Sequence, residues 1–118
     1  MITGAHVLIY SPVAEEVRAF LADVLGFSSV DARGWPIFAL PPAELAVHPV
    51  EGATTTELYL MCDDIEATLD ALRAKGAEII RPVTDQGWGL LTALRLPGGA
   101  ELGLYEPRHR TAREADGA

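Results

Sequence analysis

The chain contains the same short pattern twice. Residues 43–48 read Ala-Glu-Leu-Ala-Val-His, and residues 100–105 read Ala-Glu-Leu-Gly-Leu-Tyr. A Gly-Trp pair precedes each copy, at residues 34–35 and 87–88. Self-similarity of this kind indicates a chain built from two related units. The duplication therefore restricts the fold to one in which two copies of a single supersecondary unit pack together.

The first unit predicts a strand, a helix and three further strands. Residues 5–10 form a short apolar strand, and Ser11 and Pro12 then supply a helix cap and a proline at the first helical position. Apolar side chains recur at helical spacing until Gly26, which ends the helix. The remaining strands of this unit are predicted at residues 28–30, 35–40 and 43–48.

The second unit repeats this order of elements. A strand is predicted at residues 57–62, and Asp63 with Glu66 three residues later is typical of a capping box at the start of a helix. Gly76 ends that helix, and strands follow at residues 77–81, 89–96 and 100–105. We therefore predict an α+β fold in one domain spanning residues 1–118, made of β-α-β-β-β modules at 4–50 and 55–107 with a polar tail at 108–118.

Composition excludes several classes of protein. A net charge of −8 repels phosphate backbones and anionic lipids, so neither nucleic acid nor a membrane is an expected partner. Cys62 is the single cysteine, which rules out an internal disulfide or a cysteine-based zinc cage. No apolar run approaches the ~20 residues that span a bilayer, and no signal peptide is recognised at residues 1–4. We expect a cytoplasmic protein.

Strand alternation sorts the side chains onto two faces. One face is uniformly apolar and is expected to pack under the helices; it carries Val7, Ile9, Leu45, Val47, Leu58, Leu60, Cys62, Leu102 and Leu104. The other face mixes aromatic, acidic and histidine side chains, which suits a curved surface around a ligand or, alternatively, a solvated or subunit-contacting surface.

Four segments resemble the vicinal oxygen chelate superfamily, also called the glyoxalase, bleomycin-resistance and extradiol-dioxygenase superfamily. They are residues 5–9, 20–27, 59–65 and 96–107, which occur in this order inside the duplicated frame. The resemblance implies that the tandem modules curl into a curved mixed sheet, or cup, and that two chains form a homodimer. It also implies a divalent metal on the inner face that chelates adjacent oxygens of a substrate.

The same resemblance implies where metal ligands stand. His6 and Glu57 occupy the first-strand positions of the two modules, whereas the last-strand positions hold Ala46 and Gly103, which have no metal-binding side chain. Divalent Zn, Mn, Fe or Ni takes three or more nitrogen or oxygen ligands, so the expected positions supply an incomplete set. The sequence therefore assures no cofactor. Without metal, a hydrogen-bonded His6–Glu57 pair is an alternative acid/base site.

The other candidate ligand-binding side chains share the mixed face or the loops beside it. They are Tyr10, Trp35, His48, Tyr59, Met61, Trp88, Glu101 and Tyr105. Each aromatic residue is also open to a plain packing role, and His48 or Glu101 would complete a metal site only with a displaced metal or a shifted strand register.

Three functions remain in competition. The first is a bleomycin-resistance-like protein that binds a small organic molecule without the full metal site. The second is a metal-dependent lyase, isomerase or dioxygenase-like enzyme that uses His6, Glu57 and a displaced third ligand. The third is a non-catalytic structural or regulatory dimer.

Overall fold

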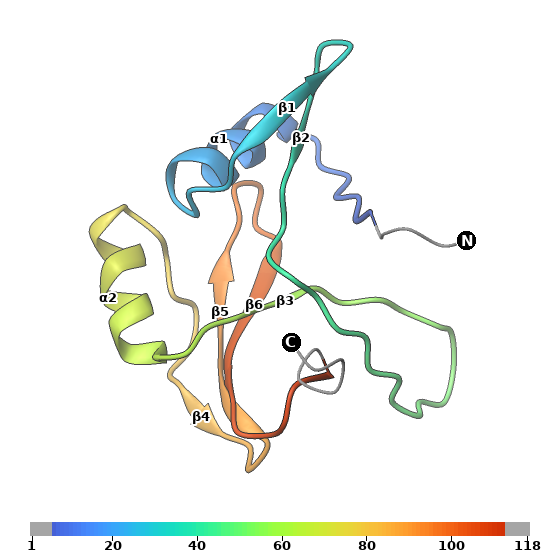
Figure 1. Ribbon diagram of the computed structural model, residues 1–118, viewed down its shortest axis with the longest axis vertical. Helices are drawn as coiled ribbons and strands as arrows, with labels where there is room; N and C mark the ends of the chain where they lie inside the picture. Colours follow the sequence, from blue (N-terminus) through green and yellow to red (C-terminus); the bar gives the residue numbers. More distant parts are fainter. Residues whose placement is uncertain (1–5, 113–118) are drawn as a thin grey trace.

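The computed structural model describes residues 6–112, which contain two helices and six strands (Figure 1). Helix α1 spans Ala14–Asp23 and is followed by a hairpin of β1 (Ser29–Ala32) and β2 (Trp35–Phe38). A long connection then leads to β3 (Tyr59–Met61) and α2 (Ile65–Ala74). Three strands complete the chain: β4 (Thr84–Asp85), β5 (Gly89–Arg95) and β6 (Glu101–Pro107). The predicted α+β class is therefore confirmed.

The four-stranded sheet has the order β3-β6-β5-β4. Strands β5 and β6 form a seven-residue antiparallel hairpin whose register runs from Gly89 opposite Pro107 to Arg95 opposite Glu101. The tight turn between them contains Gly98 at φ 89° and Gly99 at φ 98°, a backbone conformation that favours glycine. Strand β3 lies parallel to β6 on the other side and pairs Tyr59 with Gly103.

The core lies between the sheet and the helices. Ile65, Leu69 and Leu72 line one face of α2 and pack with Leu94 and Leu104 of the sheet. A second cluster joins Phe20 of α1 to Leu96 and Leu102. Fully burying one such side chain stabilises the fold by roughly 1.5–3 kcal/mol. Figure 1 shows the consequence: α2 flanks the four-stranded sheet and α1 lies beyond the β5–β6 turn.

The apolar face predicted for the second unit is confirmed. Leu102 and Leu104 are buried, and Leu58, Leu60 and Cys62 pack partly buried against the two clusters. Gly103 and Tyr105 consequently lie on the opposite face of β6, because successive side chains of a strand alternate. The predicted strand at residues 77–81 is reduced to one bridge between Ile79 and Leu94.

Both helix starts differ from the predictions. Asp64, not Asp63, caps α2, since its carboxylate accepts the Ala67 backbone N–H at 3.1 Å. Helix α1 begins at Ala14 without a side-chain cap, and Ser11 instead accepts the Val13 backbone N–H at 3.1 Å. Asp63 and Asp64 are the same residue type and have the same capping propensity, so the backbone path decides which of them caps α2. For α1, the backbone path places the Ser11 side chain too early to cap the helix.

The first unit departs most from prediction, because the strands expected at 5–10 and 43–48 do not form within the described residues. Residues 6–10 and 43–48 make no backbone–backbone hydrogen bond inside the 6–112 range. Their predicted core side chains are exposed instead, with Leu45 and Val47 each 88% accessible. Alternation indicates strand-forming potential, but a strand forms only beside a partner that satisfies its backbone.

No helix in the described part of the chain is long and apolar enough to cross a membrane.

Candidate functional site

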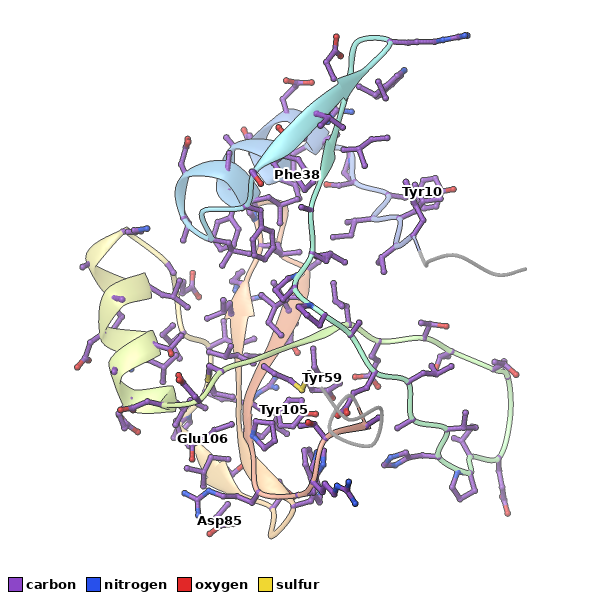
Figure 2. The ribbon with its side chains drawn as sticks, viewed as in Figure 1. Tyr10, Phe38, Tyr59, Asp85, Tyr105 and Glu106 are labelled. Atoms are coloured by element: carbon purple, nitrogen blue, oxygen red, sulfur yellow. The ribbon has the colours of Figure 1, made fainter. Side chains whose placement is uncertain are left out.

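Three aromatic side chains gather on the sheet face opposite α2, where Tyr105 contacts the other two. Tyr59 comes from β3, Tyr105 from β6 and Trp88 from the residue before β5. The ring centroids of Tyr59 and Tyr105 are 6.1 Å apart, and those of Trp88 and Tyr105 are 5.5 Å apart, both edge-to-face. We call this surface of Tyr59, Trp88, Gly103 and Tyr105 the aromatic face; Figure 2 shows Tyr59 and Tyr105 beside each other on it.

Parallel pairing of β3 with β6 explains why Tyr59 lies over Gly103. The two residues are register partners, so their side-chain directions coincide. A Cβ atom added at Gly103 would approach the Tyr59 ring to 2.5 Å at Cε1 and 2.9 Å at Cγ, with Cδ1 nearer still. The tyrosine ring therefore occupies the space that any side chain at position 103 would need.

A carboxylate is hydrogen bonded to each tyrosine. The Tyr59 hydroxyl donates to Glu57 Oε2 at 2.9 Å, and this hydrogen bond, together with burial, raises the pKa of the Tyr59 phenol above its usual value. Burial and the nearby Glu44 carboxylate raise the pKa of Tyr105 in the same direction. Both phenols are therefore neutral donors across the physiological pH range.

Glu44 joins the aromatic face to residues 109–112. Its Oε1 accepts the Tyr105 hydroxyl at 3.5 Å, and its Oε2 accepts the Ala112 backbone N–H at 2.6 Å. The His109 imidazole stacks on Tyr105, with a centroid separation of 6.2 Å and an interplanar angle of 27°. Its Nε2 lies 3.9 Å from Glu44 Oε1.

The two candidate catalytic residues do not meet. Within the described residues His6 is exposed and makes no hydrogen bond or ion pair, whereas Glu57 is engaged by Tyr59. The hydrogen-bonded His6–Glu57 pair considered from the sequence is therefore absent from this arrangement. The physical reason is that residues 6–10 do not pair with the sheet, so His6 is not positioned beside β3.

The residues present do not fit the metal centre implied by the sequence resemblance. Among residues 6–112, no three His, Cys, Asp or Glu side chains lie close enough to hold one ion. Gly103 supplies no donor, and the Tyr59 ring fills the place where a last-strand ligand would project. We therefore derive no chemistry through a metal at these positions.

The remaining predicted ligand-binding residues divide between the aromatic face and other places. Met61 belongs to β3 and is the register partner of Tyr105. Glu101 instead accepts two hydrogen bonds from Arg81, each at 2.8 Å. Trp35 lies on the β1–β2 hairpin with the Arg18 guanidinium 5.0 Å from its ring centroid.

Tyr10 and His48 do not join the aromatic face. Tyr10 is 88% exposed and lies well away from Tyr59 and Tyr105 in Figure 2. His48 is exposed and makes no hydrogen bond or ion pair within the described residues. Both residues stand in the two segments that lack strand partners.

Sequence reasoning missed two members of this cluster, Glu44 and His109. No local pattern marks Glu44, because its contacts with Tyr105 and Ala112 join positions 61 and 68 residues apart. His109 lies beyond the last predicted strand, so no periodicity places it. The part of the predicted tail at residues 113–118 lies outside the described residues.

Comparisons with known proteins agree with the resemblance. The sequence profile of the Glyoxalase/Bleomycin resistance protein/Dioxygenase superfamily matches residues 4–104. A manganese-dependent 2,3-dihydroxybiphenyl 1,2-dioxygenase of Geobacillus genomosp. 3 is 27% identical in an alignment 110 residues long, which covers 85% of this chain but 35% of that protein. The chain thus spans about a third of that relative's length.

Solved structures share the fold. TnmS3, an antibiotic binding protein from Streptomyces sp. CB03234, superposes with a TM-score of 0.63 at 21% identity, covering 91% of this chain and 99% of that one. The lactoylglutathione lyase of Agrobacterium tumefaciens gives a TM-score of 0.62 at 14% identity, with coverage of 88% and 92%. These likenesses confirm the predicted glyoxalase/bleomycin-resistance fold.

Proposed function

This chain belongs to the Glyoxalase/Bleomycin resistance protein/Dioxygenase superfamily, and we propose that it binds a small organic molecule with a planar ring on its aromatic face. Ring packing and hydrogen bonds hold the ligand, and no metal at the His6 and Glu57 positions is needed. Both enzymes and an antibiotic binding protein are among its similar proteins, so family membership alone does not select the function.

The filled space above Gly103 is the observation that carries this proposal. With the Tyr59 ring packed over that glycine, the last-strand position presents an aromatic surface and no ligating oxygen. Tyr59 remains 39% exposed and Trp88 45% exposed, so both rings are accessible to a partner. Exposed aromatic surface beside a few polar groups is typical of a ligand site.

The polar groups beside the rings define what such a ligand carries. Glu57 and Glu44 are hydrogen-bond acceptors at two edges of the aromatic face. A planar ring that bears O–H or N–H donors therefore complements this surface, whereas an anionic ligand meets two carboxylates. The antibiotic binding protein TnmS3 supports binding of an organic compound on this fold.

A fragment titration followed by NMR tests the binding proposal. We would use the Trp35→Phe variant, in which the indole N–H of Trp88 gives a single signal, and a set of planar aromatic fragments at millimolar concentration. Fragments are expected to shift the Trp88 indole and the Tyr105 amide. If no fragment moves these signals, the aromatic face is not a ligand site.

Two tyrosine variants supply the matched comparison. Tyr105→Ala removes a ring that contacts both Tyr59 and Trp88, and it should weaken fragment binding about 2- to 12-fold, the equivalent of ~0.5–1.5 kcal/mol per aromatic contact. Tyr10→Ala removes an exposed ring elsewhere and should leave affinity unchanged. Equal effects of the two variants would contradict the assignment.

A metal-dependent lyase, isomerase or dioxygenase is the alternative, favoured by the manganese-dependent relative. Elemental analysis of untagged protein, purified with Zn, Mn, Fe or Ni supplied, separates the two functions. We expect less than 0.1 metal per chain and unchanged fragment binding after chelation. Stoichiometric metal that His6→Ala or Glu57→Gln abolishes would establish the alternative and overturn our proposal.

We also infer that the chain forms a homodimer. Apolar side chains are exposed in the two segments that lack strand partners, namely Val7, Leu8, Ile9, Leu45 and Val47, and Val50 is exposed two residues beyond the second segment. Exposed apolar segments with unpaired backbone are favourable contacts for a second copy. Light scattering at micromolar concentration should give twice the chain mass of 12.6 kDa, and a monomer at that concentration would exclude the dimer.

A further inference from the structure

The chain folds back after β6 instead of leaving the sheet. The Arg108 backbone N–H donates to the Trp88 carbonyl oxygen at 2.8 Å, and the Arg108 Nε pairs with Glu106 Oε2 at 3.0 Å. Figure 1 shows the last coloured residues turning back beside the sheet. Residues 108–112 therefore begin beside the backbone of Trp88.

The next contacts carry this segment onto Tyr105. The His109 imidazole stacks on the phenol ring at 6.2 Å between centroids, which leaves that side of the ring less accessible. Three residues later, the Ala112 backbone N–H reaches Glu44 Oε2 at 2.6 Å. Residues 108–112 thus cross the aromatic face from Trp88 to Glu44.

Glu44 is one point at which this segment is fastened. Its side chain is only 18% exposed, and its two oxygens accept hydrogen bonds from the Tyr105 hydroxyl and the Ala112 backbone. A carboxylate that accepts a backbone N–H makes a stronger hydrogen bond than a neutral acceptor does. Glu44 belongs to the connection between β2 and β3, so the latch joins two irregular segments across the ligand surface.

We propose that residues 108–112 form a strap across the aromatic face, that Glu44 latches it, and that a ligand with an O–H or N–H donor competes with the strap for the Glu44 carboxylate. This inference rests on the proposed function only in its last part, because the strap and its latch exist without ligand. In the closed state the Ala112 N–H occupies the acceptor that a donor-bearing ligand would use.

Trypsin cleavage of the full chain tests the latch without any ligand. The bonds after Arg108 and Arg110 lie within the strap and require it to open before a protease can bind an extended segment. Glu44→Ala should raise the cleavage rate at these bonds at least threefold, measured by mass spectrometry. His109→Ala, which removes the stacking contact, should raise it by a smaller factor.

Glu51→Ala is the matched control for the latch. Glu51 is an exposed glutamate in the same connection between β2 and β3, and it makes no hydrogen bond or ion pair within the described residues. Its replacement should leave strap cleavage at the wild-type rate. If Glu44→Ala and Glu51→Ala give the same rate as wild type, Glu44 does not latch the strap and the inference is wrong.

Catechol and 1,2-dimethoxybenzene test the competition. They share a planar ring, but only catechol has O–H donors. Catechol kept under anaerobic conditions should raise strap cleavage in the wild type and have little further effect in Glu44→Ala, whereas the dimethyl ether should change neither rate. A catechol shift of the Trp88 indole without faster cleavage would overturn the competition; a latch effect without any fragment binding would count against the proposed function alone.

Discussion

Replacing Gly103 by alanine tests the central feature of the aromatic face. The added Cβ would lie 2.5 Å from Cε1 and 2.9 Å from Cγ of Tyr59, well inside ordinary carbon contact distances. Since Cγ belongs to the base of the ring, rotation of the ring about its own axis does not relieve the clash. Tyr59 must move off the sheet or the backbone of β3 must shift.

The structure allows the cost to be worked out. Moving Tyr59 removes its edge-to-face contact with Tyr105 and its hydrogen bond to Glu57. The contact is worth ~0.5–1.5 kcal/mol and the exposed hydrogen bond about 1 kcal/mol or less. Overpacking of this kind costs ~1–3 kcal/mol in total. For a domain of this size, the melting temperature should fall by about 4–15 °C.

The decisive measurement is a double-mutant cycle with Tyr59→Ala. Without the ring, Gly103→Ala no longer meets these three atoms and should stabilise the fold by ~0.4–1 kcal/mol, because alanine restricts the unfolded chain. The coupling between positions 59 and 103 is therefore expected at about 1.5–4 kcal/mol. Urea unfolding of all four proteins, at one protein concentration, measures it. An equal cost of Gly103→Ala in both backgrounds would refute the reasoning.

Three further predictions concern single side chains. Burial raises the pKa of the Cys62 thiol, so its reaction with a disulfide reagent at pH 8 should be slower than that of free cysteine and should accelerate as pH rises. Glu57→Gln should lower the pKa of Tyr59 toward its usual value in a spectrophotometric titration. Since folding raises that phenol's pKa, its stabilising contribution is complete below the unfolded value near 10 and is lost as pH rises through the folded value. The loss should therefore be smaller, and complete at lower pH, in the variant. Asp64→Ala should lower the free energy of unfolding by ~0.5–2 kcal/mol, measured by thermal unfolding, and Asp63→Ala should lower it by less than about 0.5 kcal/mol. A larger loss for Asp63→Ala than for Asp64→Ala would show that Asp63 is the cap.

The second unit was predictable because its signals are local. Apolar spacing places Ile65, Leu69 and Leu72 on one side of α2, and strand alternation separates Leu104 from Tyr105. These periodicities follow from the geometry of one helix or one strand and need no knowledge of the rest of the chain. Together with the sequence repeat and the family resemblance, these local patterns predicted the correct fold class.

The first unit was not predictable in the same way. Residues 43–48 alternate as regularly as residues 100–105, yet only the second copy forms a strand within the described chain. The difference is the presence of partner strands. Glu101–Pro107 lies between β3 and β5, whereas residues 43–48 make no backbone pair within the described chain. Sequence periodicity describes how a segment would bury its side chains, not whether a partner strand is present.

The sequence by itself determined the α+β fold class, the helix-packing face of the second unit and the absence of a ligating side chain at Gly103. Only the tertiary structure decided what takes the place of that side chain. Parallel pairing of β3 with β6 puts the Tyr59 ring over the glycine, and the return of the chain after β6 brings His109 and Ala112 to Glu44. These contacts join residues far apart in the sequence, so they depend on strand register and chain path, which no local pattern specifies.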